Sequence, residues 1–379
     1  MSSSQVLYTR IIETIGPLVG EQISHIKQLT HWMWITVGIL QANSIALSQI
    51  ATHIPGEAEA ESRVTTIRRG LMNFKVDVWA FYRPILEQAL RDWRAVNAAV
   101  ILDGVAVFGD RWQIFRLSLA HGCRAVPWVW VVIPGKGLTQ AERLEAMLTG
   151  AAEFLRGRVK HVTFLADRGF RDCDWAKLCL KLGWHYVIRV ACNTYVTLSD
   201  GRSCRIDKLG VQPGQRRYFQ NVGLTQEAKL RAHLSVTWTD GDAQNRPELV
   251  AVISDQPAGR ARLREYGRRM SIEQSFRDDQ SGGFDMAHTR LQHADRLERL
   301  LLAVAIATLG CHELGEHVLS KGEAHRREID PGPDRELSLF QLGLRWLKRC
   351  VSTALDRLPA FTACLSPLKL SPVVTSSNP

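Results

Sequence analysis

The sequence has 379 residues, of which 45% are hydrophobic, 8% aromatic and 23% charged. This composition is typical of a globular protein and excludes a disordered or fibrous chain, and the length predicts two or three domains. The 48 Lys and Arg residues outnumber the 38 Asp and Glu residues, which gives a formal net charge of +10. A basic excess of this size favours a polyanionic partner, nucleic acid or an anionic membrane surface, although a solvated basic surface explains the charge equally well.

Several features of the sequence argue against a membrane or secreted protein. The first residues lack a basic stretch followed by an apolar core, so we expect no signal peptide. The longest apolar runs, Trp32–Leu40 and Leu300–Leu309, are shorter than the roughly 20 residues that a membrane span needs. The 8 cysteines form no CxxC pair, and isolated cysteines are typical of reduced core residues. We therefore expect a cytoplasmic protein.

Residues 1–97 are predicted to form an all-helical domain. Apolar residues recur at helical spacing in three segments, 18–29, 34–50 and 76–90. Between the last two, a short helix, a break at Pro55–Gly56 and a further helix are arranged as in a helix-turn-helix, although any small helical bundle gives the same pattern. The further helix carries three basic residues that we expect to contact DNA: Arg63, Arg68 and Arg69.

Residues 98–191 are predicted to form the first part of an α/β catalytic domain. Val- and Ile-rich runs separated by turn residues indicate strands at 98–108, 112–120, 127–133, 161–167 and 184–190. Helical periodicity appears between the later strands, at 139–155 and 175–182. The order is a hairpin meander followed by strand–helix–strand crossovers, which predicts a mixed sheet whose first and fourth strands are neighbours.

The rest of the chain divides into three further parts. Short alternating stretches such as 233–239 and 248–254, separated by turn residues, predict a β-rich insertion at 192–257. Helical patterns at about 259–280 and at 294–309 predict the second part of the catalytic domain, residues 258–328. Residues 329–379 are expected to hold a linker, an amphipathic helical region and a disordered tail.

Three acidic residues stand at positions where a carboxylate is costly to bury without a partner. Asp103 lies inside the first predicted strand, Asp167 ends the fourth, and Glu273 lies on the helix at 259–280. Neighbouring first and fourth strands bring Asp103 and Asp167 together, where like charges repel and a divalent cation relieves the repulsion. A single Asp at a strand end is more often a turn or capping residue, but three acids on one sheet favour a two-Mg²⁺ site for phosphodiester chemistry.

The helix around Glu273 has a polar face where a core face is normally apolar. At about 100° per residue, four residues lie within about 60° of Tyr266 around the helix, so that they share its face: Arg269, Glu273, Arg277 and Gln280. We interpret this face as a phosphate-binding stripe beside a metal ligand, although a surface helix can be equally polar. Asp278 and Asp279 fall away from this face and are expected to be exposed to solvent.

Three segments carry a family resemblance: LDGVAVFG (102–109), LADRGF (165–170) and YGRRMSIEQSFRDDQ (266–280). They resemble the catalytic blocks of the DDE insertion-sequence transposases, in particular the cut-and-paste branch marked by Tyr-x2-Arg-x3-Glu-x6-Lys. The resemblance extends from about residue 30 to about residue 310. It implies an RNase H-like core that holds two Mg²⁺ (or Mn²⁺) ions on Asp103, Asp167 and Glu273. It also implies that DNA is bound by Tyr266, Arg269 and Arg168.

The sequence departs from the family pattern at two places. Gln280 occupies the Lys position, so a charge-assisted phosphate contact is lost, and Arg277, one turn earlier, is expected to compensate. Leu249 stands where some hairpin-forming relatives have an aromatic residue that stacks on a flipped base. Trp238 is another aromatic residue of the insertion, but it reads more readily as a sheet-face residue. Whether a DNA hairpin forms is therefore left open.

The resemblance and the residues together predict a bacterial, nucleoid-associated DNA transposase. Such an enzyme cleaves DNA at the terminal inverted repeats of an insertion element and joins the 3′-OH ends to target DNA. We expect it to act on double-stranded DNA as a homodimer, with no membrane partner. The alternative is a catalytically silent, transposase-derived DNA-binding protein acting as a repressor or architectural factor, which the residue at position 280 favours and the intact acids disfavour.

Overall fold

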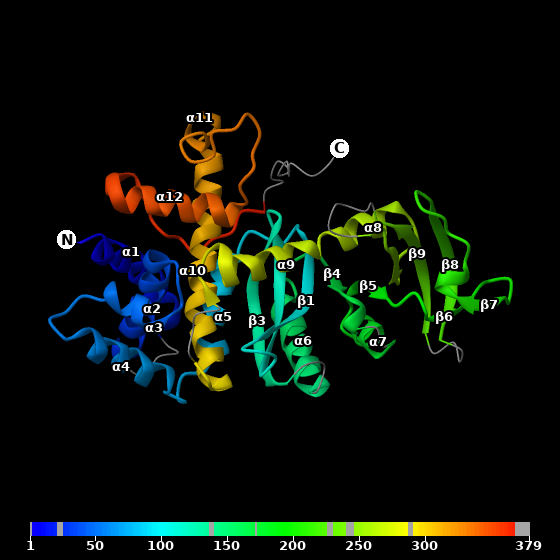
Figure 1. The fold of residues 1–379 in the computed structure, drawn as a ribbon, viewed down its shortest axis with the longest axis horizontal. Helices are drawn as coiled ribbons and strands as arrows, with labels where there is room; N and C mark the ends of the chain where they lie inside the picture. The colour runs from blue at the N-terminus through cyan, green and yellow to red at the C-terminus, as the bar shows by residue number, and fades with distance from the viewer. Residues whose placement is uncertain are drawn as a thin grey trace.

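The computed structural model describes residues 2–20, 26–135, 140–170, 173–225, 230–239, 246–286 and 291–367. The molecule is elongated, with the N-terminal helices at one end, the first strands of a large sheet in the middle and the later strands at the other end (Figure 1). Within the described ranges, no helix is long and apolar enough to cross a membrane. The predicted disordered tail, 371–379, lies outside the described residues.

The N-terminal region is helical, as predicted. Its helices are α1 (Ser3–Val19), α2 (Ile26–Ala42), α3 (Leu47–Thr52), α4 (Ala60–Leu71) and α5 (Val78–Ala89). The expected single helix over 34–50 is wrong, because α2 ends at Ala42 and α3 begins at Leu47. Asn43 turns the chain with a φ of 49°, and the Ser44 hydroxyl accepts a hydrogen bond from the Ala46 N–H, so the side chain satisfies a backbone donor at the break.

The helix–break–helix pattern at 47–71 is confirmed. Helices α3 and α4 pack against each other and are joined by the segment that contains Pro55 and Gly56. The Arg63 guanidinium donates hydrogen bonds to the carbonyls of Ile54 (3.3 Å) and Gly56 (3.2 Å). Arg63 therefore fixes the turn between the two helices.

The middle of the chain forms the predicted meander and crossovers. Its elements are β1 (Asn97–Val107), β2 (Trp112–His121), β3 (Arg124–Pro134), α6 (Ala141–Leu155), β4 (His161–Ala166), a 3₁₀ turn (Arg168–Phe170), α7 (Cys173–Lys181) and β5 (His185–Val190). The strands lie in the order β3-β2-β1-β4-β5, with β1–β2 and β2–β3 antiparallel and β1–β4 and β4–β5 parallel. This arrangement confirms the α/β class of the RNase H-like kind and the pairing of the first and fourth strands.

The β-rich stretch continues the same sheet. Strands β6 (Tyr195–Thr197), β7 (Ser203–Arg205), β8 (Arg216–Leu224), β9 (Leu230–Trp238) and β10 (Leu249–Ser254) follow, with a 3₁₀ turn at Ile206–Lys208. Strand β10 pairs with β5 on one side and with β9 on the other, both antiparallel. The described strands thus make one ten-stranded sheet, in which the segment predicted as an insertion is an extension of the catalytic sheet.

The predicted single helix over about 259–280 is interrupted. Helix α8 (Arg260–Gly267) and helix α9 (Met270–Arg277) are separated by a tight turn at Arg268–Arg269, where backbone N–H groups bond to carbonyls three residues earlier. After Arg277 the helix widens into a π-helix (Asp278–Gly282). The turn and the π-helix both change the angle between successive side chains, so a constant 100° per residue does not hold along the whole segment.

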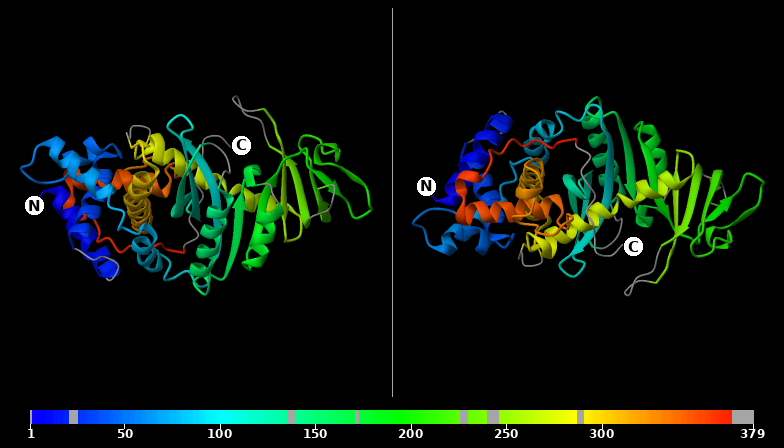
Figure 2. Two further views of the ribbon diagram at one scale, coloured as in Figure 1. Left: turned by 90° about the horizontal axis from the view of Figure 1, so that it is seen from below. Right: turned by 90° about the horizontal axis from the view of Figure 1, so that it is seen from above.

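The C-terminal helices join the helical end to the sheet. Helix α10 (Ala294–Ser320) is apolar and largely buried, as predicted, and it contacts α2, α12 (Leu339–Thr353) and β3. It crosses between the N-terminal helices and the sheet in the views of Figure 1 and Figure 2. Helix α12 is preceded by the short helix α11 (Glu323–Arg326) and followed by a 3₁₀ turn (Leu355–Arg357). The following segment returns over α1 and α5, where Arg10 bonds to the Pro359 carbonyl (2.9 Å) and the Trp93 indole to the Leu365 carbonyl (2.8 Å).

Candidate active site

The register of β1 and β4 places two of the predicted acids at the same level of the sheet. Leu102 pairs with Ala166 across the parallel strands, and each is followed directly by an acid, Asp103 and Asp167. Glu273 comes from α9, which lies against β1, β2 and β3. The charges of Asp167 and Glu273 both act on Asp103. Three segments far apart in the sequence thus bring the predicted acids into one electrostatic cluster.

Asp103 lies in a largely desolvated position on β1. Its side chain is 15% exposed, and the Gly104 N–H donates a hydrogen bond to its carboxylate (2.8 Å). Burial raises the pKa of Asp103 to about 6, and the repulsion from Asp167 and Glu273 adds to this, whereas Arg269 and the Gly104 N–H oppose it. A carboxylate held in this way gains from any additional positive charge that comes within reach.

Asp167 lies at the end of β4, where the chain turns into the 3₁₀ segment. Its carboxylate accepts a hydrogen bond from the Gly169 N–H at 2.7 Å, which fixes the side chain over the turn. Arg168, predicted to bind DNA, is exposed and pairs with Glu248 at 3.2 Å. Glu248 also pairs with Arg189, at 2.5 Å, so it connects the end of β4 to β5 and to the start of β10.

Arg269 lies at the centre of the cluster. Its guanidinium donates to Asp103 (2.9 Å) and to Glu273, and its Nε donates to the Tyr266 hydroxyl (3.1 Å). Arg269 is only 7% exposed. Desolvation by itself would lower the pKa of Arg269, but Tyr266, Glu273 and Asp103 together raise it above its usual value, so this residue is a fixed positive charge. The sequence indicated a DNA contact here and gave no sign that Arg269 joins two of the acids.

The acid cluster has the carboxylate donors that a hard divalent cation requires, but the side chains are not spaced as the ligands of one ion. Carboxylate oxygens are the ligands that Mg²⁺ prefers, and the partly desolvated Asp103 carboxylate needs a counter-charge. In the part of the chain that the structure describes, no group of three His, Cys, Asp or Glu side chains is close enough to hold a metal ion as it stands. The Arg269 guanidinium lies between Asp103 and Glu273 and balances part of their charge. The chemistry of these donors therefore suits a hard divalent cation, whereas Arg269 occupies the place between two of them in this structure.

The two other polar residues predicted on the Glu273 face lie further along the helix. Arg277 is exposed at the end of α9. Gln280 is partly buried within the π-helix, so the angle that placed it beside Glu273 does not apply there. Their proposed contact with DNA stays a prediction.

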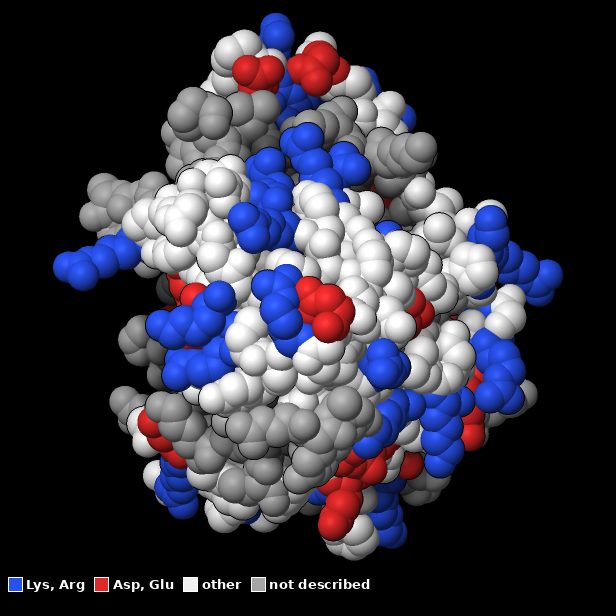
Figure 3. Space-filling view, turned by 90° about the vertical axis from the view of Figure 1, so that its right-hand side faces the viewer, with Lys and Arg blue, Asp and Glu red and all other residues white. Residues whose placement is uncertain are grey.

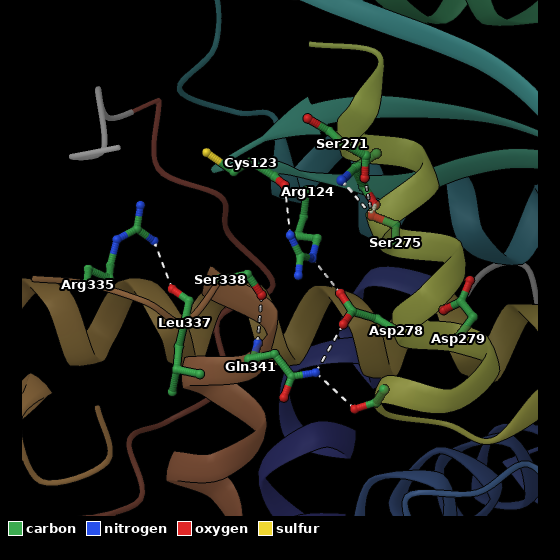
Figure 4. A network of polar contacts seen from close by, with 12 residues as sticks. Cys123, Arg124, Ser271, Ser275, Asp278, Asp279, Arg335, Leu337, Ser338 and Gln341 are labelled. Atoms are coloured by element: carbon green, nitrogen blue, oxygen red, sulfur yellow. Dashed lines mark hydrogen bonds and ion pairs between the residues drawn. The ribbon is translucent and has the colours of Figure 1, made fainter. Parts of the chain in front are cut away.

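The expectation that Asp278 and Asp279 face solvent is wrong, because both are buried, at 6% and 3% exposure. Asp279 forms an ion pair with the buried Arg116 of β2, and Asp278 pairs with Arg124 of β3 at 2.6 Å. Gln341 of α12 adds a hydrogen bond to Asp278 at 3.0 Å. Figure 4 shows how this buried network joins the end of α9 to β3 and α12. Two arginines that precede Glu273 by about 150 residues supply the partners, which the helical pattern alone could not show.

The three basic residues predicted in α4 have different environments. Arg63 is engaged with the turn before α4, whereas Arg68 and Arg69 are exposed in its last turn. Arg68 also lines a hollow of about 710 Å³ beside the turn between α2 and α3. Arg68 and Arg69 are thus available for an external contact, and Arg63 is primarily structural.

The far end of the sheet is basic. Figure 3 looks onto this end, where Lys and Arg side chains outnumber Asp and Glu on the visible surface. The exposed basic residues of β8, β9 and the preceding loops are Arg202, Lys208, Arg216, Arg217 and Arg231. Trp238 donates its indole N–H to the Val211 carbonyl (2.8 Å), which supports its interpretation as a sheet-face residue.

Comparison with known proteins gives a match to a family model and matches to solved structures. Residues 138–309, somewhat less than half of the chain, match the family model described as "Transposase DDE domain"; this range includes Asp167 and Glu273, and Asp103 precedes it. No curated protein matches the sequence. Among 8 matching chains of solved structures is a cryo-EM structure of the piggyBac transposase synaptic complex with hairpin DNA. The two share 11% identity with a TM-score of 0.47, over 94% of this chain and 80% of that one.

Proposed function

We propose that this protein is a DNA transposase whose catalytic residues are Asp103, Asp167 and Glu273. The observation that carries the proposal is the convergence of these acids from β1, the end of β4 and α9, in a chain whose residues 138–309 match a transposase DDE domain. Clustered carboxylates that lack enough positive charge favour a cationic cofactor and, through it, a phosphate substrate.

The proposed reaction has two steps that use one site. In the first, a water oxygen forms a bond to phosphorus at the element's end, the P–O3′ bond breaks, and the 3′ oxygen takes up a proton to leave a 3′-OH. In the second, that 3′-OH gives up its proton as its oxygen forms a bond to a phosphorus of target DNA, the P–O3′ bond there breaks, and the displaced 3′ oxygen takes up a proton. When bound, two Mg²⁺ or Mn²⁺ ions supply the charge that activates the attacking oxygen and stabilises the leaving one. Asp103, Asp167 and Glu273 would hold them.

The chain's own residues bind and orient the DNA. Arg269 and Tyr266 form a bonded pair beside the acids, so they present a guanidinium and a hydroxyl to a phosphate at the reacting position. A guanidinium that leaves the carboxylates for a phosphate keeps a charge-assisted hydrogen bond while it frees the acids. Arg168, Arg277 and Gln280 extend the track, with Gln280 as a neutral donor. Arg68 and Arg69 would contact the element's ends, and a homodimer would pair two ends.

The test is metal-dependent cleavage of a duplex that carries an element end. Replacing any one acid with Ala, for example Asp167→Ala, should remove cleavage while folding and DNA binding persist. Glu145→Ala, which removes an exposed carboxylate from α6, is the matched control and should cleave normally. Retained Mg²⁺-dependent nicking in Asp167→Ala would refute the assignment of the acids.

A second function has a specific observation in its favour. Arg269 already forms ion pairs with two of the acids, and Gln280 replaces the basic residue of the family pattern. Both features would suit a silent DNA-binding descendant that acts as a repressor or architectural factor. Such a protein would bind end-containing DNA but would leave it uncut with either Mg²⁺ or Mn²⁺. Absence of cleavage in the unmodified protein together with tight DNA binding would favour this second function.

A further inference from the structure

A separate hollow of about 680 Å³ lies beside the helix pair α8–α9. Its walls come from the β2–β3 turn, from the helix pair and from the chain that leads into α12, the region around Cys123, Ser271 and Ser338 in Figure 4. Three arginines line it, Arg124, Arg264 and Arg268, against one acid, Glu336. The hollow is therefore basic, and nothing in the proposed reaction uses it.

Two of these arginines have no partner among the described residues. Arg264 and Arg268 are exposed, and neither takes part in a described ion pair or side-chain hydrogen bond. The acid nearest in sequence to both, Glu265, pairs with Arg262 at 3.0 Å. Partial desolvation lowers the pKa of Arg268 and the Glu265 carboxylate opposes this, so the guanidinium lacks a full counter-charge. An anion in the hollow would supply it.

The hollow is on a different face of the helix pair from the acid cluster. Tyr266, Arg269 and Glu273 contact one another on one side, whereas the residues that line the hollow from this segment are Arg264, Gly267, Arg268, Met270, Ser271 and Gln274. At about 100° per residue, Arg264 lies about 160° from Tyr266 within α8. A ligand held by Arg264 is therefore directed away from the acids, and a single phosphate cannot occupy both places.

We propose that Arg264 and Arg268 bind backbone phosphates of a duplex DNA segment other than the one at the acid cluster. The arginines stand about one helical turn apart on an open surface, which suits successive phosphates of a strand better than one enclosed anion. Arginine forms bidentate hydrogen bonds to phosphate, and these two lack competing carboxylates. Met270, which is 47% exposed, lies beside them. This inference rests on the proposed function, since it takes DNA to be the substrate.

The experiment measures how DNA binding depends on salt. The parent is the full chain carrying Asp167→Ala, without divalent cation, and the probe is a linear duplex that carries no element end. Each phosphate contact contributes about 0.9 to the slope of log affinity against log salt, so Arg264→Ala/Arg268→Ala should make the slope shallower by about 1.8. At about 0.1 M salt this corresponds to a loss of several tens of fold in affinity.

Matched variants separate the hollow from general charge. Arg83→Ala/Arg91→Ala removes the same net charge from two exposed, acid-paired arginines and should leave the slope near that of the parent. Arg264→Lys/Arg268→Lys should keep the slope, which would show that the loss in the Ala pair is not misfolding. An unchanged slope in the Ala pair overturns the inference, as does an equal loss in the control pair. So does a change in self-association without a change in DNA binding.

The outcome for the hollow is independent of the outcome for the acids. If the proposed function fails, the unmodified protein leaves the DNA uncut, while the salt slopes still measure the contribution of Arg264 and Arg268 to DNA binding. Failure of the inference would appear as an unchanged slope in the Ala pair while end cleavage by the unmodified protein proceeds. The two experiments therefore distinguish the two failures.

Discussion

The acid cluster and the buried network are two charged groups built from the same pieces of the fold. Asp103 and Arg116 are directly opposite each other on β1 and β2, so one belongs to each group. The helix that supplies Glu273 to the cluster runs on into Asp278 and Asp279 of the network. Neighbouring positions on the same strands and the same helical segment thus belong to two different charged groups.

The difference lies in the balance of charge. The network sets the carboxylates of Asp278 and Asp279 against the guanidiniums of Arg124 and Arg116, and the Arg116 guanidinium also stacks over the Phe276 ring at 4.4 Å. Among the described residues, the cluster sets three carboxylates against the guanidinium of Arg269, which forms ion pairs with two of them. A buried group whose charges balance strongly resists the loss of one member, whereas a group with surplus negative charge favours the binding of a cation. Balance of charge, more than burial, separates a structural group from a functional one here.

The largest expected effect comes from removing a cluster carboxylate. Glu273→Gln should reduce DNA cleavage on the order of a thousand-fold or more, because a carboxylate is replaced by a neutral amide where charge is needed. The free energy of unfolding should not fall, since the change removes surplus negative charge. End cleavage and chemical denaturation measured side by side check both parts. A variant that unfolds easily would show that the cluster, like the network, is structural.

The next largest effect concerns the network. Asp279→Ala should lower the free energy of unfolding by about 3–5 kcal/mol, because it leaves the Arg116 charge buried and unpaired. Arg116→Met/Asp279→Leu removes both charges and should recover most of that loss. Urea denaturation of the three proteins is the measurement. A loss below about 1 kcal/mol in Asp279→Ala would contradict the balance argument.

A smaller effect is expected from pH. The folded pKa of Asp103 is raised from 3.8 to about 6, so the native state binds more protons than the unfolded state between these values. The stability that this protonation contributes is complete below pH 3.8 and is lost as the pH rises through about 6. In the presence of a chelator, the free energy of unfolding of the unmodified protein should therefore rise by about 1 kcal/mol relative to that of Asp103→Asn as the pH falls from 7 to 5. If the free energies of unfolding of the two proteins change in parallel with pH, the raised pKa of Asp103 is contradicted.

The smallest effect is expected at position 280. A charged hydrogen bond to phosphate exceeds a neutral one by about 1 kcal/mol, so Gln280→Lys should speed cleavage or tighten end binding several-fold. Arg277→Ala should reduce cleavage more than Gln280→Ala, because Arg277 is the exposed guanidinium at the end of α9. Cleavage rates at fixed Mg²⁺ and salt decide between them. A silent Arg277→Ala with a severe Gln280→Ala would reverse the assignment.

Much of the fold and the positions of the acids could be predicted from the sequence. Strand alternation and apolar runs located β1 to β5, and the pairing of the first and fourth strands followed from the order of elements. Local periodicity failed where a short-range contact changes the backbone, as at Asn43 and Ser44, at the Arg268–Arg269 turn and in the π-helix. Those changes depend on single hydrogen bonds, to which an averaged pattern is insensitive.

The sequence by itself determined which segments are strands and helices, because burial imposes a period on apolar residues, and it determined which acids stand at strand ends. Only the tertiary structure decided what each charge faces. Arg116 and Asp279 are 163 positions apart, and Arg269 reaches Asp103 across 166. The energy of a charge depends on the solvent and the opposite charges within a few ångströms, and these are set by chain crossings that leave no period in the sequence. The same sequence motif thus contains a structural pair and a candidate catalytic acid, and only packing separates them.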